Sequence, residues 1–250
     1  MLPHYSYPRY AIVRLAGNVF FGGRRSFQQD ARDCLALLEP SLRLLGAEHI
    51  PAGGPAVITF NHYFRPGFNA WWMALALDSV VPSPMHFVMT GELTYPGKWY
   101  APLGRTVSRW ALGRLSQVYG FTPMPPMPPR PRDVAARARA VRRTLEFARL
   151  NPQALIGLAP EGGDNPPTGA LARPASGAGR FLLLLADLGF NVVPAGVYEE
   201  NGALCLRFGP IYRLSVPASL STAERDSAAA GVVMQAIAAL LPERLRGPFA

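Results

Sequence analysis

The chain has little lysine, cysteine or histidine and no long apolar run. Lys98 is the only lysine, so 24 of the 25 basic residues are arginine, a bias that by itself indicates no function. The two cysteines, Cys34 and Cys205, stand far apart, as in a cytosolic protein with reduced thiols. No window reaches the roughly 18 uninterrupted apolar residues of a membrane-spanning helix, and no secretory signal pattern opens the chain. We therefore expect a cytoplasmic protein that has no disulfide bond and does not span a membrane.

Basic charge is concentrated in one part of the chain. The net charge is +9, and the first 150 residues carry 18 basic against 8 acidic side chains. Ten of these arginines lie between residues 105 and 149, a pattern that suits an anionic membrane surface, a phosphate-rich ligand or nucleic acid. The sequence has no zinc-ligand spacing, no aromatic-glycine RNA-binding signature and no compact helix-turn-helix pattern. It therefore predicts no metal site and no nucleic-acid partner, and leaves the other two ligands open.

Length and pattern predict one α/β domain with a helical extension. With 250 residues and 49% hydrophobic content, the chain can bury a substantial core. From Pro51 onward, predicted strands and helices alternate, which is typical of a mostly parallel central sheet flanked by helices. Residues 51–250 are the predicted α/β domain. Residues 1–50 are a predicted N-terminal helical segment, with helices over 10–21 and 26–45. The first of these helices is aromatic and suits either a membrane surface or packing on the domain core.

Several further elements follow from local signals. Asp133 is predicted to cap a helix that Asn151 and Pro152 end, and Ser221 and Glu224 form a capping box that opens the last helix. Six prolines between residues 123 and 131 predict an extended, rigid rim beside the binding pocket. The remaining predictions are a helix from about residue 69, strands over 86–89 and 154–159, a helix over 180–188, and a hairpin of strands 192–198 and 204–208.

Polar residues stand at the ends of two predicted buried strands. The apolar run 56–60 ends on Asn61-His62, and the run 154–159 ends on Pro160-Glu161-Gly162, with Glu161 99 positions beyond His62. Because ligands bind outside the carboxyl ends of parallel strands, His62 and Glu161 are expected to face one crevice. A histidine there can act as a general base.

The order of these motifs resembles the glycerophospholipid acyltransferase superfamily, whose best-known members acylate lysophosphatidic acid. The shared features are Asn61-His62, the Pro160-Glu161-Gly162 turn, the strand ending in Val192-Val193-Pro194, and Phe208-Gly209-Pro210-Ile211. The resemblance covers roughly residues 50 to 215 and implies His62 as the catalytic base. It also implies that Asn61, Pro160, Glu161, Gly162 and Gly163 take part in substrate binding.

The chain departs from the superfamily pattern at three polar positions. Gly67 stands where the superfamily has the aspartate that orients the histidine. Pro126 and Asp164 stand where it has arginines that hold the acceptor phosphate. We predict that Asp164 replaces the missing carboxylate partner of His62, with capping of the turn at 165–167 as the alternative. A substrate phosphate, if present, is predicted to bind Arg65, Arg130 or Arg132.

Two functions remain open at this stage. The first is an acyltransferase that moves a fatty acyl group from a thioester of coenzyme A or acyl carrier protein to a hydroxyl of a glycerolipid or related acceptor. It needs no other cofactor and works at the inner face of an anionic membrane. The second is a catalytically inactive relative that binds lipid or a partner, which the loss of the aspartate at Gly67 favours.

Overall fold

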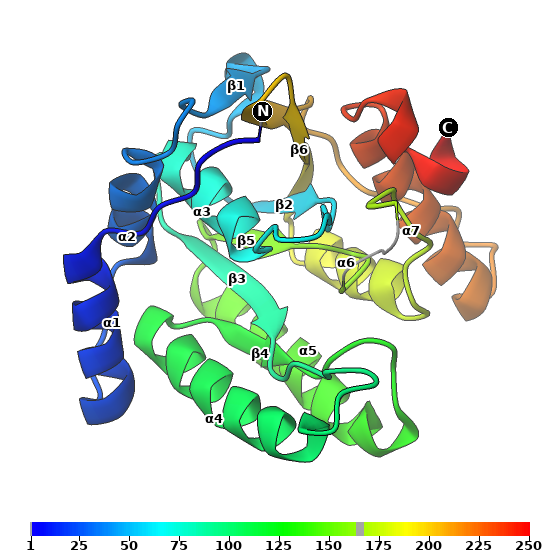
Figure 1. The fold of residues 1–250 in the computed structure, drawn as a ribbon. Coiled ribbons are helices and arrows are strands. Elements are labelled where there is room, and N and C mark those ends of the chain that lie inside the picture. Colours follow the sequence, from blue (N-terminus) through cyan, green and yellow to red (C-terminus); the bar gives the residue numbers. More distant parts are fainter. Residues whose placement is uncertain (1, 164–167) are drawn as a thin grey trace.

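The fold is built around one sheet with helices on both faces (Figure 1). The computed structural model describes residues 2–163 and 168–250, and within them the sheet has seven strands in the order β1-β7-β6-β2-β5-β3-β4. All neighbouring strands are parallel except β6 and β7. The predicted mostly parallel α/β architecture is therefore confirmed. The strands are β1 (Arg43–Leu45), β2 (Ala56–Phe60), β3 (Met85–Thr90), β4 (Thr122–Met124), β5 (Leu155–Leu158), β6 (Asn191–Glu200) and β7 (Ala203–Phe208).

Two groups of helices enclose the sheet. Figure 1 shows α1 and α2 on one side and α6 and α7 on the other. Helix α2 packs on α3, whereas α6 packs on both α5 and α7. Among the helices that the structure describes, none is both long enough and apolar enough to cross a membrane. The helices are α1 (Arg9–Phe21), α2 (Phe27–Leu35), α3 (Trp71–Val80), α4 (Ala101–Tyr119), α5 (Val134–Leu150), α6 (Ala178–Asp187) and α7 (Thr222–Ala238), with short 3-10 turns at Ala47–His49, Pro131–Asp133, Glu243–Leu245 and Gly247–Phe249.

Strand β2 lies in the middle of the sheet and is buried at every position. Parallel strands that are covered on both faces are continuous apolar runs, which explains why Ala56–Phe60 and Leu155–Leu158 contain almost no polar side chain. The register pairs Thr59 with Leu158 and Phe60 with Ala195. The loops that follow β2 and β5 therefore leave the sheet at the same edge, side by side.

The N-terminal segment contributes a strand as well as helices. The predicted helix over residues 26–45 is wrong beyond Leu35, where α2 ends. Pro40 cannot continue a helix and restricts Glu39 before it, and residues 43–45 instead form β1, which pairs in parallel with β7. A strand that pairs with a partner far along the chain leaves no local periodicity to detect. The division of the chain at residue 50 stays a prediction.

Two elements between β3 and β5 have no counterpart among the predictions. Helix α4 begins with Pro102 in its first turn and ends at Gly120 in the left-handed conformation, which are ordinary start and stop signals. Strand β4 includes Pro123, and it occupies the edge of the sheet, where a missing amide hydrogen is tolerated. Helix α5 begins where predicted, but the Asp133 side chain makes no capping hydrogen bond and pairs with Arg130.

Other local predictions are confirmed. Strands β6 and β7 form the antiparallel hairpin, and Asn201 takes the positive φ that its turn requires. Ser221 and Glu224 make both hydrogen bonds of the capping box. The thiols of Cys34 and Cys205 are buried and free.

Candidate active site

Asn61 ties the end of β2 to β6. Its amide nitrogen donates to the carbonyl of Val197 at 2.8 Å, and its amide oxygen accepts the Val197 N–H at 2.7 Å. The side chain, only 2% exposed, thus acts like one more backbone pair of the ladder. This pairing fixes the point at which the chain leaves the sheet and His62 begins the loop. The role of Asn61 in substrate binding stays a prediction.

The Glu161 carboxylate holds the start of the His62 loop. Its Oε2 accepts the backbone N–H of His62 at 2.7 Å, and its Oε1 accepts the backbone N–H of Ala172 at 2.7 Å. Glu161 is buried, and a buried carboxylate is costly unless its oxygens accept hydrogen bonds, as they do here. The structure therefore brings together the two strand ends that carry His62 and Glu161.

The Pro160-Glu161-Gly162 turn lies next to Met127 of the proline-rich segment, residues 123–131. Gly162 has a φ of +73°, and a Cβ at this position would lie 2.9 Å from Cγ of Met127. Both the backbone conformation and the close approach therefore require glycine. Met127 and the neighbouring residues Pro125 and Pro129 line the cavity described next. The proline-rich segment therefore lies beside the pocket, as predicted. Gly163 lies under the same side chain, where a Cβ would be 3.4 Å from Cβ of Met127.

His62 lines a large cavity at this edge of the sheet. The cavity has a volume of about 1200 Å³, and Pro160 and Gly162 also line it. Typical small-molecule pockets have volumes of roughly 300–1000 Å³, so this one has room for parts of two substrates. Glu161 is not among the lining residues, and its carboxylate contacts the backbone N–H groups of His62 and Ala172.

The cavity has two arms, because helices from both faces of the sheet line it. His62 and Pro160, which follow β2 and β5, line the same cavity. The first, called the α1/α4 arm, is mostly apolar and includes Ile12, Leu15, Met73, Leu112, Leu115 and Phe121, with Asp30 of α2 also in the lining. The second, called the α5/α6 arm, includes Arg137, Val141, Arg142, Arg180, Phe181 and Leu184.

Arg65 lies outside the residues that line this cavity, and it forms an ion pair with Glu199. Its Nη2 donates to Oε1 of Glu199 at 2.7 Å, and its Nε donates to the other carboxylate oxygen. Tyr5 donates to the same carboxylate at 2.6 Å, and Tyr63 at 3.3 Å. The guanidinium thus fastens the His62 loop to β6. Phosphate binding by Arg65 stays a prediction, and it would have to compete with this carboxylate.

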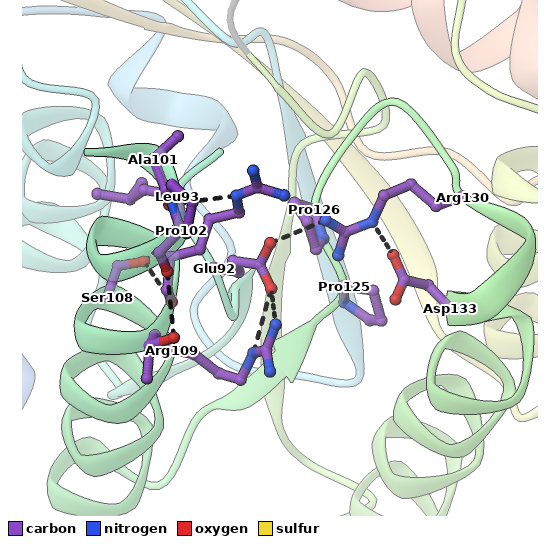
Figure 2. A network of polar contacts seen from close by, with 12 residues as sticks. Glu92, Leu93, Ala101, Pro102, Ser108, Arg109, Pro125, Pro126, Arg130 and Asp133 are labelled. Carbon is purple, nitrogen blue, oxygen red and sulfur yellow. Dashed lines mark hydrogen bonds and ion pairs between the residues drawn. The ribbon is translucent and has the colours of Figure 1, made fainter. Parts of the chain in front are cut away.

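Arg130 lines the cavity but is bound by two carboxylates (Figure 2). Its Nη1 donates to Oε1 of Glu92 at 2.8 Å, and its Nε pairs with Asp133. Arg109 from α4 donates to the other oxygen of Glu92. Hydrogen bonds from Arg130 and Arg109 lower the pKa of Glu92 to about 2. The network links the end of β3, α4 and the start of α5, and leaves Arg130 with little uncompensated charge. Arg132, the third predicted phosphate ligand, is exposed and outside the cavity lining.

The superfamily's orienting aspartate has no counterpart on the loop after β2. Gly67 has a φ of +79°, a conformation that side-chain-bearing residues rarely adopt. The Asn69 side chain, which follows on the same loop, makes two hydrogen bonds: its amide oxygen accepts the N–H of Trp71 at 3.0 Å, and its amide nitrogen donates to the Tyr7 hydroxyl at 3.2 Å. Asp164 lies outside the described residues, so its pairing with His62 stays a prediction.

Sequence reasoning missed three arginines of the cavity wall. Arg137 and Arg142 flank an apolar stripe of α5, and Arg180 lies in the first turn of α6. The stripe has helical spacing, so the flanking positions could have been identified from it. Within residues 2–163 and 168–250, no group of three or more His, Cys, Asp or Glu side chains is placed to hold a metal ion.

The likeness of this chain to known proteins is one of structure. No family model matches the chain, and no curated protein matches it. Among solved structures, the chain is similar to the crystal structure of the 1-acyl-sn-glycerophosphate (LPA) acyltransferase PlsC from Thermotoga maritima. The two are 14% identical, with a TM-score of 0.48 over 92% of this chain and 88% of that one.

Proposed function

We propose that this chain is an acyltransferase that moves a fatty acyl group from an acyl thioester to a hydroxyl of a glycerolipid or related acceptor. One observation carries the proposal. His62, held by Glu161 of the Pro-Glu-Gly turn, lines a cavity of about 1200 Å³ at the joint carboxyl ends of β2 and β5. A half-buried histidine beside a largely apolar cavity suits a reaction of long-chain substrates that excludes water.

His62 acts as the general base in the proposed reaction. Its imidazole accepts the proton of the acceptor hydroxyl while the hydroxyl oxygen bonds to the thioester carbonyl carbon. The tetrahedral intermediate then collapses, the carbon–sulfur bond breaks, and the imidazolium returns the proton to the leaving thiolate. Asn61 and Glu161 position the His62 backbone for both proton transfers. Asp164 is proposed to hold the imidazole in the tautomer that accepts the hydroxyl proton.

A transfer assay tests this function. The purified protein is incubated with acyl-coenzyme A or acyl carrier protein bearing a labelled acyl chain, together with a whole lipid extract. We expect a labelled lipid, and we expect His62→Ala to lower its formation by about 10²- to 10⁴-fold, the usual value of general-base catalysis. The matched control is His49→Ala, because His49 is a partly exposed histidine that is not among the residues lining the cavity. Transfer that persists in His62→Ala would exclude this base.

The alternative is a catalytically inactive relative that binds lipid or a partner. Gly67 favours it, since loss of an orienting carboxylate costs about four orders of magnitude in serine proteases. Absence of transfer from either donor, with lipid bound stoichiometrically in the cavity, would support this alternative.

We also propose that the protein works in the cytoplasm at the inner face of the membrane, with α1 and α4 against the lipid. Phe20 of α1 and Trp110 of α4 are in contact, with ring centroids 5.5 Å apart, and Arg114 of α4 donates to the carbonyl of Val19 at 2.8 Å. The two helices thus form one apolar face, called the α1/α4 face, whose exposed members include Val13, Phe20, Phe21, Leu103, Val107 and Trp110. Flanking arginines suit anionic headgroups, and the same two helices line the apolar arm of the cavity.

A further inference from the structure

We infer that the α5/α6 arm of the cavity binds the phosphate-bearing coenzyme A part of the acyl donor, through Arg137, Arg142 and Arg180. The inference rests on the proposed acyl transfer and assigns one arm to each substrate. The apolar α1/α4 arm then takes hydrocarbon chains, and the arginine-bearing arm takes the anionic carrier.

Among the described residues, the arginines of this arm form no ion pair. No carboxylate of the described residues lies within ion-pair distance of Arg137, Arg142 or Arg180. Arg137 donates to the carbonyls of Pro125 and Pro126 at 3.2 and 3.0 Å, which orients its guanidinium but leaves its charge in place. Arg130, by contrast, is bound by the carboxylates of Glu92 and Asp133. Three cations on one cavity wall fit a ligand with several phosphates.

The Asp226 carboxylate of α7 accepts hydrogen bonds from backbone groups at the start of α6. Oδ2 of Asp226 accepts the N–H of Gly177 at 2.7 Å, and its Oδ1 accepts the N–H of Arg180 at 2.7 Å. These bonds engage the N–H groups of Gly177 and Arg180 at the start of α6, so these two amides are not available to a phosphate. An anion at this place therefore depends on the guanidinium groups.

The shape of the arm also suits a bound carrier. Val141 lies between Arg137 and Arg142 on the cavity side of α5, and Phe181 and Leu184 line it from α6. An apolar groove with cations along its wall can hold the ring of a nucleotide and its phosphates together. Pro160, Gly162 and His62 line the same cavity as these arginines, so we infer that a carrier bound in this arm presents its thioester to the base.

Binding of free coenzyme A tests this assignment without any turnover. Calorimetry is done on the His62→Ala protein, so that loss of catalysis and loss of the donor site are measured separately. We expect Arg142→Gln and Arg180→Gln each to weaken coenzyme A binding about tenfold, in line with loss of a charge-assisted contact. Arg139→Gln and Arg143→Gln are the matched controls, because these arginines are exposed on α5 but lie outside the cavity lining. We expect both controls to change binding by less than about twofold.

Ligand series give a second readout. Removal of the 3′-phosphate, as in dephospho-coenzyme A, is expected to weaken binding, and the weakening is expected to shrink in Arg142→Gln or Arg180→Gln. Equal effects of cavity and control arginines would indicate general charge attraction and overturn the site. The site would also be overturned if coenzyme A did not bind while acyl carrier protein bound and donated.

Discussion

The backbone N–H of His62 donates to Oε2 of Glu161 at 2.7 Å, across 99 positions of sequence. Glu161 is the central residue of the Pro-Glu-Gly motif, and its carboxylate contacts the backbone of the protein itself. The second carboxylate oxygen accepts the N–H of Ala172, so one buried side chain joins the loop after β2, the loop after β5 and the approach to α6. A carboxylate is well suited to this place because both of its oxygens accept and neither donates.

Replacement of Glu161 by glutamine tests this arrangement. Glutamine offers one acceptor and one donor, so one of the two backbone N–H groups would face an NH₂ group. We expect Glu161→Gln to lower the free energy of unfolding by about 1–3 kcal/mol and also to lower kcat. Urea denaturation and the transfer assay measure the two effects. Glu146→Gln is the control, because Glu146 is exposed on α5 and should leave both values unchanged. An unchanged free energy of unfolding would contradict a stabilising role for the two hydrogen bonds of Glu161.

Asp164→Asn tests the proposed partner of His62. Asparagine keeps the size of the side chain but removes the charge that stabilises an imidazolium. We expect kcat to fall by about tenfold or more, with the KM for the acceptor changed less than about twofold. Asp187→Asn, an exposed change in α6, is the control. If Asp164 instead caps the following turn, the variant will lose stability and keep its kcat.

Asp78 makes stability depend on pH. Burial raises the pKa of Asp78 to about 7, while Oδ1 accepts the N–H of Met85 at 2.8 Å. No described residue hydrogen-bonds its Oδ2. The folded protein therefore holds a proton that the unfolded chain releases as pH rises through 3.8, the ordinary pKa of an aspartate. The free energy of unfolding should fall as pH rises from about 4 to about 7, and the full loss should persist above about 7.

Asp78→Asn is the corresponding variant. It keeps an acceptor for Met85 and removes the buried charge, so we expect a gain of about 1–3 kcal/mol at pH 8 and a much smaller change at pH 4. Urea denaturation at both pH values measures the difference. A variant that is less stable than the parent at pH 8 would mean that the charge itself stabilises the fold.

The α1/α4 face makes a prediction about membrane binding. Phe21 is 92% exposed, and burial of a phenylalanine in lipid is worth about 1.5–3 kcal/mol. We expect Phe21→Glu to lower binding to anionic vesicles about tenfold or more, as measured by flotation at low salt. Ile211→Glu is the control, because Ile211 is 51% exposed and belongs to neither helix. Equal binding of neutral and anionic vesicles would exclude the role of the arginines.

Local order along the chain was sufficient to predict much of this protein. Apolar runs identified β2 and β5 because a parallel strand buried on both faces must be apolar throughout. The residues after each run placed His62 and Glu161 at one edge, since parallel strands share the edge at which they end. The hairpin and the capping box of α7 depend on neighbouring residues, and both were predicted for that reason.

Only the tertiary structure decided which polar groups meet. Arg65 and Glu199 are 134 positions apart, and Glu92 lies 38 positions from Arg130, so no spacing rule connects them. These ion pairs neutralise the charges of Arg65 and Arg130. Arg137, Arg142 and Arg180 line the cavity and form no ion pair with a described residue. The sequence determined where strands end and which side chains stand there. The packing of helices on both faces of the sheet decided what each side chain contacts, because such contacts depend on distances that the order of residues does not contain.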